Sequence, residues 1–375
     1  MSEDSSKPKS TPNYWDYLEL KPLLGLQGGL EKDETQLHTD ELHFIVTHQA
    51  LELWFKLILA EIRDARDSLS SPKVPEESIP HVVHHLGRVN EILKLAGDTF
   101  SVMETLTPQD FMSFRDKLTP ASGFQSFQMR EMELLMGVHW ESRVKYGNVD
   151  PLDHIRKLAK DSPAGGLALS RLEHVLQETS LKDAMRSWVY RTPIFGSQPH
   201  QEGDAAVVDH FVQAYGESVR AHHNSQYDRL VATSVGRAEE LRTRYDKTTA
   251  TALSYINAED IEDTKERAYV KRYRAGIIFI ESYRELPLLA WPRLLIDALV
   301  SVDAQMVNFR HRHARAVEKI IGRRVGTGGS SGVNYLDETT KIRVFHDLWT
   351  ARTVLLPKER RPTLENAEFY QFESL

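Results

Sequence analysis

Residues 38–62 read HTDELHFIVTHQALELWFKLILAEI, and the interpretation of the whole chain starts from this stretch. Thr39, Asp40 and Glu41 supply the acceptors and the negative charge that the free N–H groups at a helix start require. Six side chains then recur at alternating steps of four and three: Phe44, His48, Leu51, Phe55, Ile58 and Ile62. This spacing places all six on one face of an α-helix, so we expect that face to pack inward.

His48 is the one titratable member of this stripe. A buried imidazole needs a hydrogen bond, a metal ion or a ligand, because an unpaired polar group is costly away from water. The helix alone therefore leaves two interpretations open. His48 is either a core histidine paired with a neighbour or a functional residue.

The composition is that of a globular protein, with 375 residues of which 41% are hydrophobic and 27% charged. The formal net charge is −7, so no overall basic field favours binding to nucleic acid or an anionic membrane. The chain has no cysteine, which excludes disulfides, thiolate metal ligands and a cysteine nucleophile. These features favour a cytoplasmic protein.

The sequence pattern predicts no membrane span and no N-terminal export signal. No run approaches the roughly 18 consecutive apolar residues that a bilayer span needs. Residues 1–13, MSEDSSKPKSTPN, are polar and lack an apolar core, so we expect a disordered lead-in and no signal peptide.

A second inward stripe is predicted on the last long helix, which follows Pro292. Its members again step by fours and threes: Leu295, Leu299, Val302, Met306, Phe309, His313, Val317 and Ile320. Gly322 and the basic pair Arg323 and Arg324 are typical of a helix C-terminus. His313 is therefore a second histidine within an apolar face, whereas His311 lies about 200° away and should be exposed.

Two further features point to a ligand. Arg115 shares a helix face with Phe111 and Leu118, and a guanidinium in such a place needs an anion opposite it. That anion is either an internal carboxylate or the acidic group of a ligand. Residues 325–336, VGTGGSSGVNYL, form a glycine-rich loop in which the backbone can approach a ligand closely, although it lacks the Gly-Lys-Ser/Thr ending of a phosphate-binding loop.

Another long helix is predicted from about Pro80 to Met103, and three histidines lie at its start: His81, His84 and His85. No carboxylate or cysteine occurs at ligand spacing within this segment. We therefore expect a solvated helix end here, in preference to a metal site.

The chain shows no internal repeat and no sustained strand alternation, so we predict an all-α helical bundle. We expect a single domain over residues 14–357, in which residues 146–260 form a smaller, variable helical subregion. Residues 358–375 are assigned to a C-terminal tail.

Three known catalytic or metal-binding motifs can be compared with the sequence. A di-iron bundle would need the motif Glu-x-x-His on two helices, and a zinc hydrolase would need the motif His-Glu-x-x-His. A serine hydrolase would need a Gly-x-Ser-x-Gly turn that carries its nucleophile. The chain has neither of the two metal motifs. Residues 328–332, GGSSG, match this turn only in their letters, because they follow a predicted helix and no strand. A haem pocket remains compatible with the two inward histidines, one of which would be the axial ligand in an apolar slot.

Five segments resemble the signature stretches of the tryptophan 2,3-dioxygenase family. They are YWDYLEL (14–20), FIVTHQALELWFK (44–56), FRDKLTPASGFQSFQMREME (114–133), FRHRHARAV (309–317) and VGTGGSSGVNYL (325–336). The resemblance extends over about residues 14–357, and residues 146–260 match only in general helical character. It implies a cytosolic, homotetrameric, all-α enzyme with haem b, ferrous in its active state, that inserts both atoms of O₂ across the indole C2–C3 bond of L-tryptophan to give N-formylkynurenine.

The resemblance also implies a role for individual residues. His313 would be the proximal iron ligand, and His48 the distal histidine beside the indole N–H. Arg115 would bind the substrate carboxylate, and Thr327 the amino-acid end. Three positions match an arm that a neighbouring subunit contributes to the pocket: Tyr14, Tyr17 and Leu18. Phe44, Phe111, Leu118 and Ser122 match the pocket lining, and Ala121 matches a haem contact.

Three other functions remain open at this point. The chain could be a biosynthetic relative that acts on a modified indole or a tryptophan derivative. It could also be a haem sensor or carrier without catalysis, or a purely structural bundle.

Overall fold

The computed structural model describes residues 13–75, 77–119, 121–138, 155–157, 159–160, 163–233, 237–327 and 332–371. Throughout these residues the regular structure is helical, and no strand is present apart from an isolated bridge between Ile194 and Ser197. The predicted all-α class is confirmed. Residues 1–12, much of the start of the 146–260 subregion and the centre of the glycine-rich loop lie outside the described residues.

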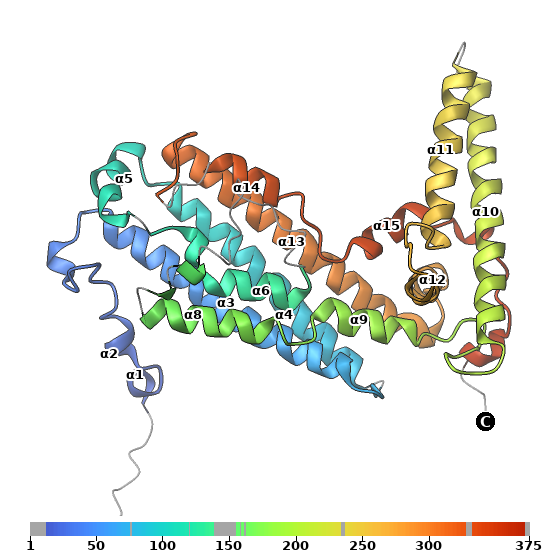
Figure 1. Cartoon of the computed structure of the whole chain (residues 1–375), viewed down its shortest axis with the longest axis horizontal. Helices are drawn as coiled ribbons and strands as arrows, with labels where there is room; N and C mark the ends of the chain where they lie inside the picture. Colours follow the sequence, from blue (N-terminus) through green and yellow to red (C-terminus); the bar gives the residue numbers. More distant parts are fainter. Residues whose placement is uncertain are drawn as a thin grey trace, which may run out of the picture.

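Three long helices form the main bundle (Figure 1). They are α3 (Glu41–Ser70), α4 (Ser78–Met103) and α13 (Ala290–Ile321). Helix α4 packs against both α3 and α13, while α6 (Phe127–Met136) and α9 (Leu181–Tyr190) cover α3. Each of the three carries an apolar stripe toward the others, which is the arrangement that buries most of their nonpolar surface.

The stripe on α3 is buried as predicted along most of its length. Leu51, Phe55, Ile58 and Ile62 have 6% or less of their surface exposed, whereas Phe44 is half-buried and His48 is open to a cavity. Helix α13 ends as predicted at Gly322, whose φ of 61° favours glycine. His311 is exposed, which confirms the predicted register of α13.

The other helices complete the described part of the chain. In chain order they are α1 (Tyr14–Tyr17), α2 (Leu20–Leu23), η1 (Glu34–Gln36), α5 (Pro108–Phe114), η2 (Arg115–Leu118), η3 (Gly123–Gln125), α8 (Pro163–Val175), α10 (Asp204–Thr233), α11 (Ala238–Ile256), α12 (Thr264–Ser282), η5 (Pro287–Leu289), α14 (Val333–Thr339), α15 (His346–Val354), η6 (Lys358–Arg360) and η7 (Ala367–Tyr370). Helices α10 and α11 form a hairpin that projects away from the main bundle (Figure 1). Helix α8 packs instead on α6.

The C-terminal residues pack onto the base of this hairpin. Tyr370 is 1% exposed, and its hydroxyl donates to Pro193 O and accepts from the Gly196 amide. The segment after residue 357 is therefore anchored to the fold as far as the structure describes it.

Of the three histidines at the start of α4, His81 and His84 are exposed as the sequence predicted, and His85 is not. His85 is buried, and its Nδ1 lies 2.6 Å from Glu61 Oε2 on α3, while its Nε2 lies 2.8 Å from His81 Nε2. Glu61 also accepts from Arg88 at 2.6 Å. The prediction missed this partner because it comes from another helix. Among the described residues, no group of three or more histidine or carboxylate side chains is placed to hold a metal ion.

None of the helices in the described ranges is long and apolar enough to cross a membrane.

Candidate active site

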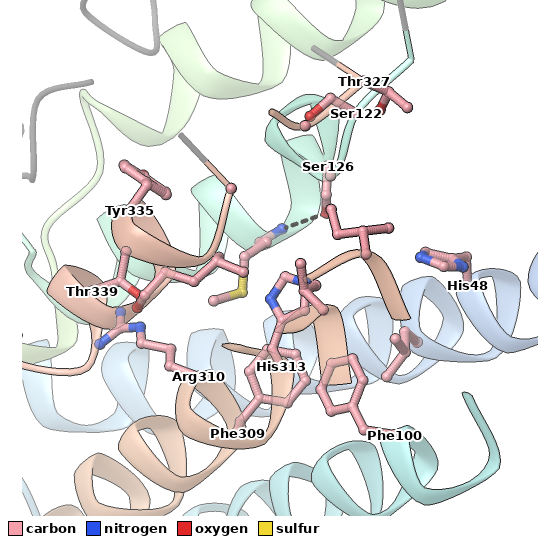
Figure 2. Close-up of a pocket in the computed structure, with 18 of the residues that line it drawn as sticks. His48, Phe100, Ser122, Ser126, Phe309, Arg310, His313, Thr327, Tyr335 and Thr339 are labelled. Carbon is pink, nitrogen blue, oxygen red and sulfur yellow. Dashed lines mark hydrogen bonds between the residues drawn. The ribbon is translucent and has the colours of Figure 1, made fainter. Parts of the chain in front are cut away.

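The site is a largely apolar cavity of about 250 Å³ between α3, α4, α6, α13 and α14. Seven of the residues singled out from the sequence line it together: Phe44, His48, Phe111, Arg115, Ser122, His313 and Thr327. They come from segments that lie far apart along the chain. Figure 2 shows His48 and His313 on different helices, facing the same space.

His313 lies on α13 at the floor of the cavity. Burial lowers the pKa of its imidazole to about 4, and the nearby His48 and Arg130 act in the same direction. The ring is therefore neutral at physiological pH. A neutral imidazole has a lone pair available to a metal, which is the form that binds haem iron.

His48 lies on the wall formed by α3. Its Nδ1 is 2.8 Å from the carbonyl oxygen of Phe44, one turn earlier, and since a carbonyl can only accept, Nδ1 carries the proton. Loss of water around the ring is the main cause that lowers the pKa of His48. The neutral ring then has Nε2 as a hydrogen-bond acceptor.

Three phenylalanines form an aromatic wall next to His48. The ring of Phe44 lies 4.1 Å from that of His48 and 5.8 Å from those of Phe111 and Phe114, measured between centroids. Phe111 and Phe114 meet edge to face at 5.4 Å. Such a wall suits a flat apolar group, because offset and edge-to-face ring contacts are favourable.

Arg115 and Thr327 lie at the rim of the cavity and contact each other's segments. Arg115 Nη2 donates to Val325 O at 2.6 Å, and Thr327 Oγ1 donates to Ala121 O at 2.5 Å. These two bonds hold the described start of the glycine-rich loop against the 115–121 segment. The rim therefore combines a fixed positive charge with a hydroxyl.

A second polar region lies on the side of His313 away from His48, where Figure 2 shows Arg310, Tyr335 and Thr339. Arg310 pairs with Glu133 at 2.9 Å, and Arg130 pairs with the same carboxylate at 2.9 Å. This polar region was not predicted from the sequence. Arg310 could have been found, because it precedes His313 by about one turn on the same helix face.

The remaining predicted residues lie outside the cavity lining in this chain. Leu118 is half-buried against the core, and Ala121 is exposed apart from the carbonyl that accepts from Thr327. Tyr14, Tyr17 and Leu18 are exposed on and just after α1, with 69%, 80% and 41% of their surfaces accessible.

These residues fit a haem group chemically. Haem is a flat apolar disc with two carboxylates at one edge and a metal that accepts an axial imidazole. The cavity offers the neutral His313, apolar walls that include Phe55 and Phe309, and guanidinium groups at one end. The fold and the site together define a class, helical proteins with a histidine-containing pocket suited to haem.

Comparison with known proteins identifies the family within this class. A family model described as tryptophan 2,3-dioxygenase matches residues 2–355, and the chain belongs to this family. A protein named tryptophan 2,3-dioxygenase from Sorangium cellulosum is 43% identical over 96% of this chain and 87% of its own length. Tryptophan 2,3-dioxygenase 2 of Ralstonia nicotianae is 42% identical over 98% of both chains. The protein named tryptophan 2,3-dioxygenase from Anopheles gambiae is 34% identical over 94% of this chain and 88% of its own.

Proposed function

We propose that this chain is a haem-dependent dioxygenase that inserts both atoms of O₂ across the indole C2–C3 bond of L-tryptophan, giving N-formylkynurenine. Membership of the family supports the reaction. The observation that carries the assignment to this chain is one cavity lined by both His48 and His313, with Arg115 at its rim. This reaction is the first step of tryptophan breakdown through kynurenine.

We assign haem b to the floor of the cavity, with His313 as the iron ligand and Arg130 and Arg310 near the carboxylates of the haem. Bound ferrous haem would supply the site at which O₂ is activated. The protein contributes a dry, apolar surrounding and a ligand held in its neutral form. Following the family resemblance, we assign Ala121 to the haem contact and Ser122 to the substrate pocket.

The substrate is positioned by two kinds of contact. The aromatic wall of Phe44 and Phe111 holds the indole, and the fork of Arg115 binds the carboxylate, with Thr327 at the same rim. His48 Nε2 accepts a hydrogen bond from the indole N–H, since Nδ1 already donates to Phe44 O. His48 thus orients the indole and does not need to remove its proton.

We further propose a cytoplasmic homotetramer in which Tyr14, Tyr17 and Leu18 reach the active site of a neighbouring subunit. Two observations support association. The arm formed by these three residues is exposed, and α3 presents outward-facing apolar side chains, each at least 38% exposed: Leu42, Val46, Leu53 and Leu57. Exposed apolar surface of this extent is typical of an interface.

The test is to reduce the purified protein without oxygen, add L-tryptophan, then admit O₂ and follow the visible spectrum throughout. We expect haem bands that change with L-tryptophan, followed by the absorbance of N-formylkynurenine. Haem bands that respond without product would indicate a sensor or a relative acting on a modified indole. Absence of haem bands after haem supply would overturn the assignment of His313.

A further inference from the structure

An aromatic ring on α4 lies flat against the imidazole of His313. The Phe100 and His313 rings are 5.1 Å apart between centroids, and their planes differ by only 7°. Figure 2 shows the two side chains approaching from different helices, with Phe309 beside them. Phe309 lies further from His313, at 6.4 Å and 42°. Phe100 is therefore the ring that is parallel to the imidazole.

Phe100 itself is held in place by its surroundings. It is 5% exposed, and its ring packs at 5.3 Å from that of Phe309, which in turn meets Phe55 edge to face at 5.7 Å. A ring confined on several sides has few alternative rotamers, because protein cores are close-packed. The face that Phe100 presents to His313 is consequently fixed.

Contacts between α4 and α13 fix the crossing of the two helices within one turn of Phe100. Gly97, one turn before Phe100, faces α13, and an added Cβ would be in ordinary contact with it, 3.5 Å from Arg312 Cδ and 3.9 Å from Phe309 Cα. Arg312, the residue before His313, pairs with Asp98 at 2.8 Å and donates to Gly97 O at 3.3 Å. The helices on both sides of the stacked pair are therefore tied together.

We propose that Phe100 is a positioning residue that sets the plane of the His313 imidazole and, through it, the bond between that ring and the haem iron. The inference rests on the proposed function, in which His313 is the iron ligand. A flat neighbour restricts rotation of the imidazole about its Cβ–Cγ bond. The surroundings of an axial ligand tune both haem binding and iron electronics.

The experiment compares wild type with Phe100→Met, Phe100→Leu and Phe100→Tyr, all loaded with haem. Methionine nearly preserves the side-chain volume but removes the flat face, whereas tyrosine keeps the ring. Phe211→Met is the matched control, because Phe211 is also buried but lies outside the cavity lining. The primary readout is the iron–histidine stretching band of the ferrous protein in resonance Raman spectra. The second is the rate of haem transfer to apomyoglobin.

We expect the stretching band to shift or broaden in Phe100→Met and Phe100→Leu, and to stay at the wild-type position in Phe100→Tyr and Phe211→Met. Haem loss should accelerate about 2- to 10-fold in the first two variants, as removal of one aromatic contact implies. Wild-type bands in both nonaromatic variants would overturn the inference. A wild-type protein with bound haem but no iron–histidine band would instead overturn His313 as the ligand, and the inference with it.

Discussion

Arg115 is the residue whose loss should affect the reaction most selectively. We expect Arg115→Ala to lower kcat/KM for L-tryptophan by on the order of 2–4 kcal/mol, about 30- to 1000-fold, because a bidentate contact to the carboxylate disappears. Arg115→Lys should recover only part of this loss, since an ammonium cannot reproduce the planar fork. Steady-state kinetics measure both effects.

The control for this prediction is thermal unfolding. Arg115 is half-buried and its described hydrogen bond reaches only the Val325 carbonyl, so the melting temperature should change little. Equal kcat/KM values for wild type and Arg115→Ala would show that the carboxylate is bound elsewhere.

His48 should increase the rate of L-tryptophan turnover without being essential for it. We expect His48→Ala to reduce turnover without abolishing it, because the ring acts as a hydrogen-bond acceptor for the indole N–H and not as an essential base. Since burial lowers the pKa of His48, the acceptor form persists to lower pH than for a free imidazole, and the acidic decline of kcat/KM attributable to it should begin correspondingly lower. A variant that binds haem and L-tryptophan but makes no product would contradict this role.

At the scale of elements, a fully buried carboxylate on α13 binds both the segment before α15 and α15 itself. Asp303 is fully buried and accepts from the Val344 and Phe345 amides at 3.1–3.2 Å and from Trp349 Nε1 at 2.9 Å. Asp303→Asn should cost about 1–3 kcal/mol of unfolding free energy, because one acceptor oxygen becomes an NH₂ group and the remaining hydrogen bonds lose their charge.

Urea unfolding of the apoprotein measures this cost, and Asp297→Asn is the matched control on the same helix. Asp297 is 43% exposed and pairs with Arg352 at the surface, so its substitution should change stability by less than about 1 kcal/mol. Similar losses in the two variants would show that Asp303 has no special part in holding the segment.

The α3–α4 contact should respond to acid through Glu61. Burial disfavours the charged carboxylate, but hydrogen bonds from Arg88 and His85 outweigh it, so the pKa of Glu61 is lower than its ordinary value of 4.5. A carboxylate whose pKa is lowered by folding stabilises the fold at pH values above its pKa in the unfolded chain. This stabilisation is lost as the pH falls through its pKa in the folded protein. We expect Glu61→Gln to be less stable than wild type at pH 7 and to show a flatter decline below about pH 4.5.

Unfolding free energies measured in urea between about pH 7 and pH 3 test this difference. Parallel profiles for wild type and Glu61→Gln would mean that the pair contributes nothing to the acid sensitivity.

The helices were predictable from the sequence because their apolar stripes are long and periodic. The stripe of α13 and the end of this helix at Gly322 follow from local pattern alone. The contacts between different helices could not be predicted from this local pattern. His85 on α4 pairs with Glu61 on α3, and Arg310 on α13 pairs with Glu133 on α6. Such pairs depend on how two helix faces pack together and not on the residue spacing along one helix.

At the scale of the whole molecule, the exposed arm predicts sites shared between subunits. We expect the protein to be a tetramer by light scattering, and a variant with Tyr14→Ala and Tyr17→Ala to lose activity while binding haem. If the arm acts in a neighbour, mixed tetramers of this variant and Arg115→Ala should recover roughly a quarter of the wild-type activity, because some sites then combine an intact arm with an intact Arg115. No recovery in verified mixed tetramers would place the arm in its own subunit's site.

The resemblance named seven of the residues that line the cavity before the structure brought them together. It could not show that Phe44, Arg115 and Thr327 lie around one space with His48 and His313, because that depends on the packing of distant segments. The polar end formed by Arg130, Glu133 and Arg310 was found only in three dimensions.

The hydrogen bond between Arg115 and the Val325 carbonyl has a consequence for ligand choice. One nitrogen of the guanidinium donates to the chain's own backbone, and this bond fixes the orientation of the planar group. The remaining N–H groups can meet a charged carboxylate with two acceptor oxygens, whereas a neutral amide offers one uncharged acceptor. The backbone contact thus aligns the fork for amino acids, and uncharged indoles gain little from it.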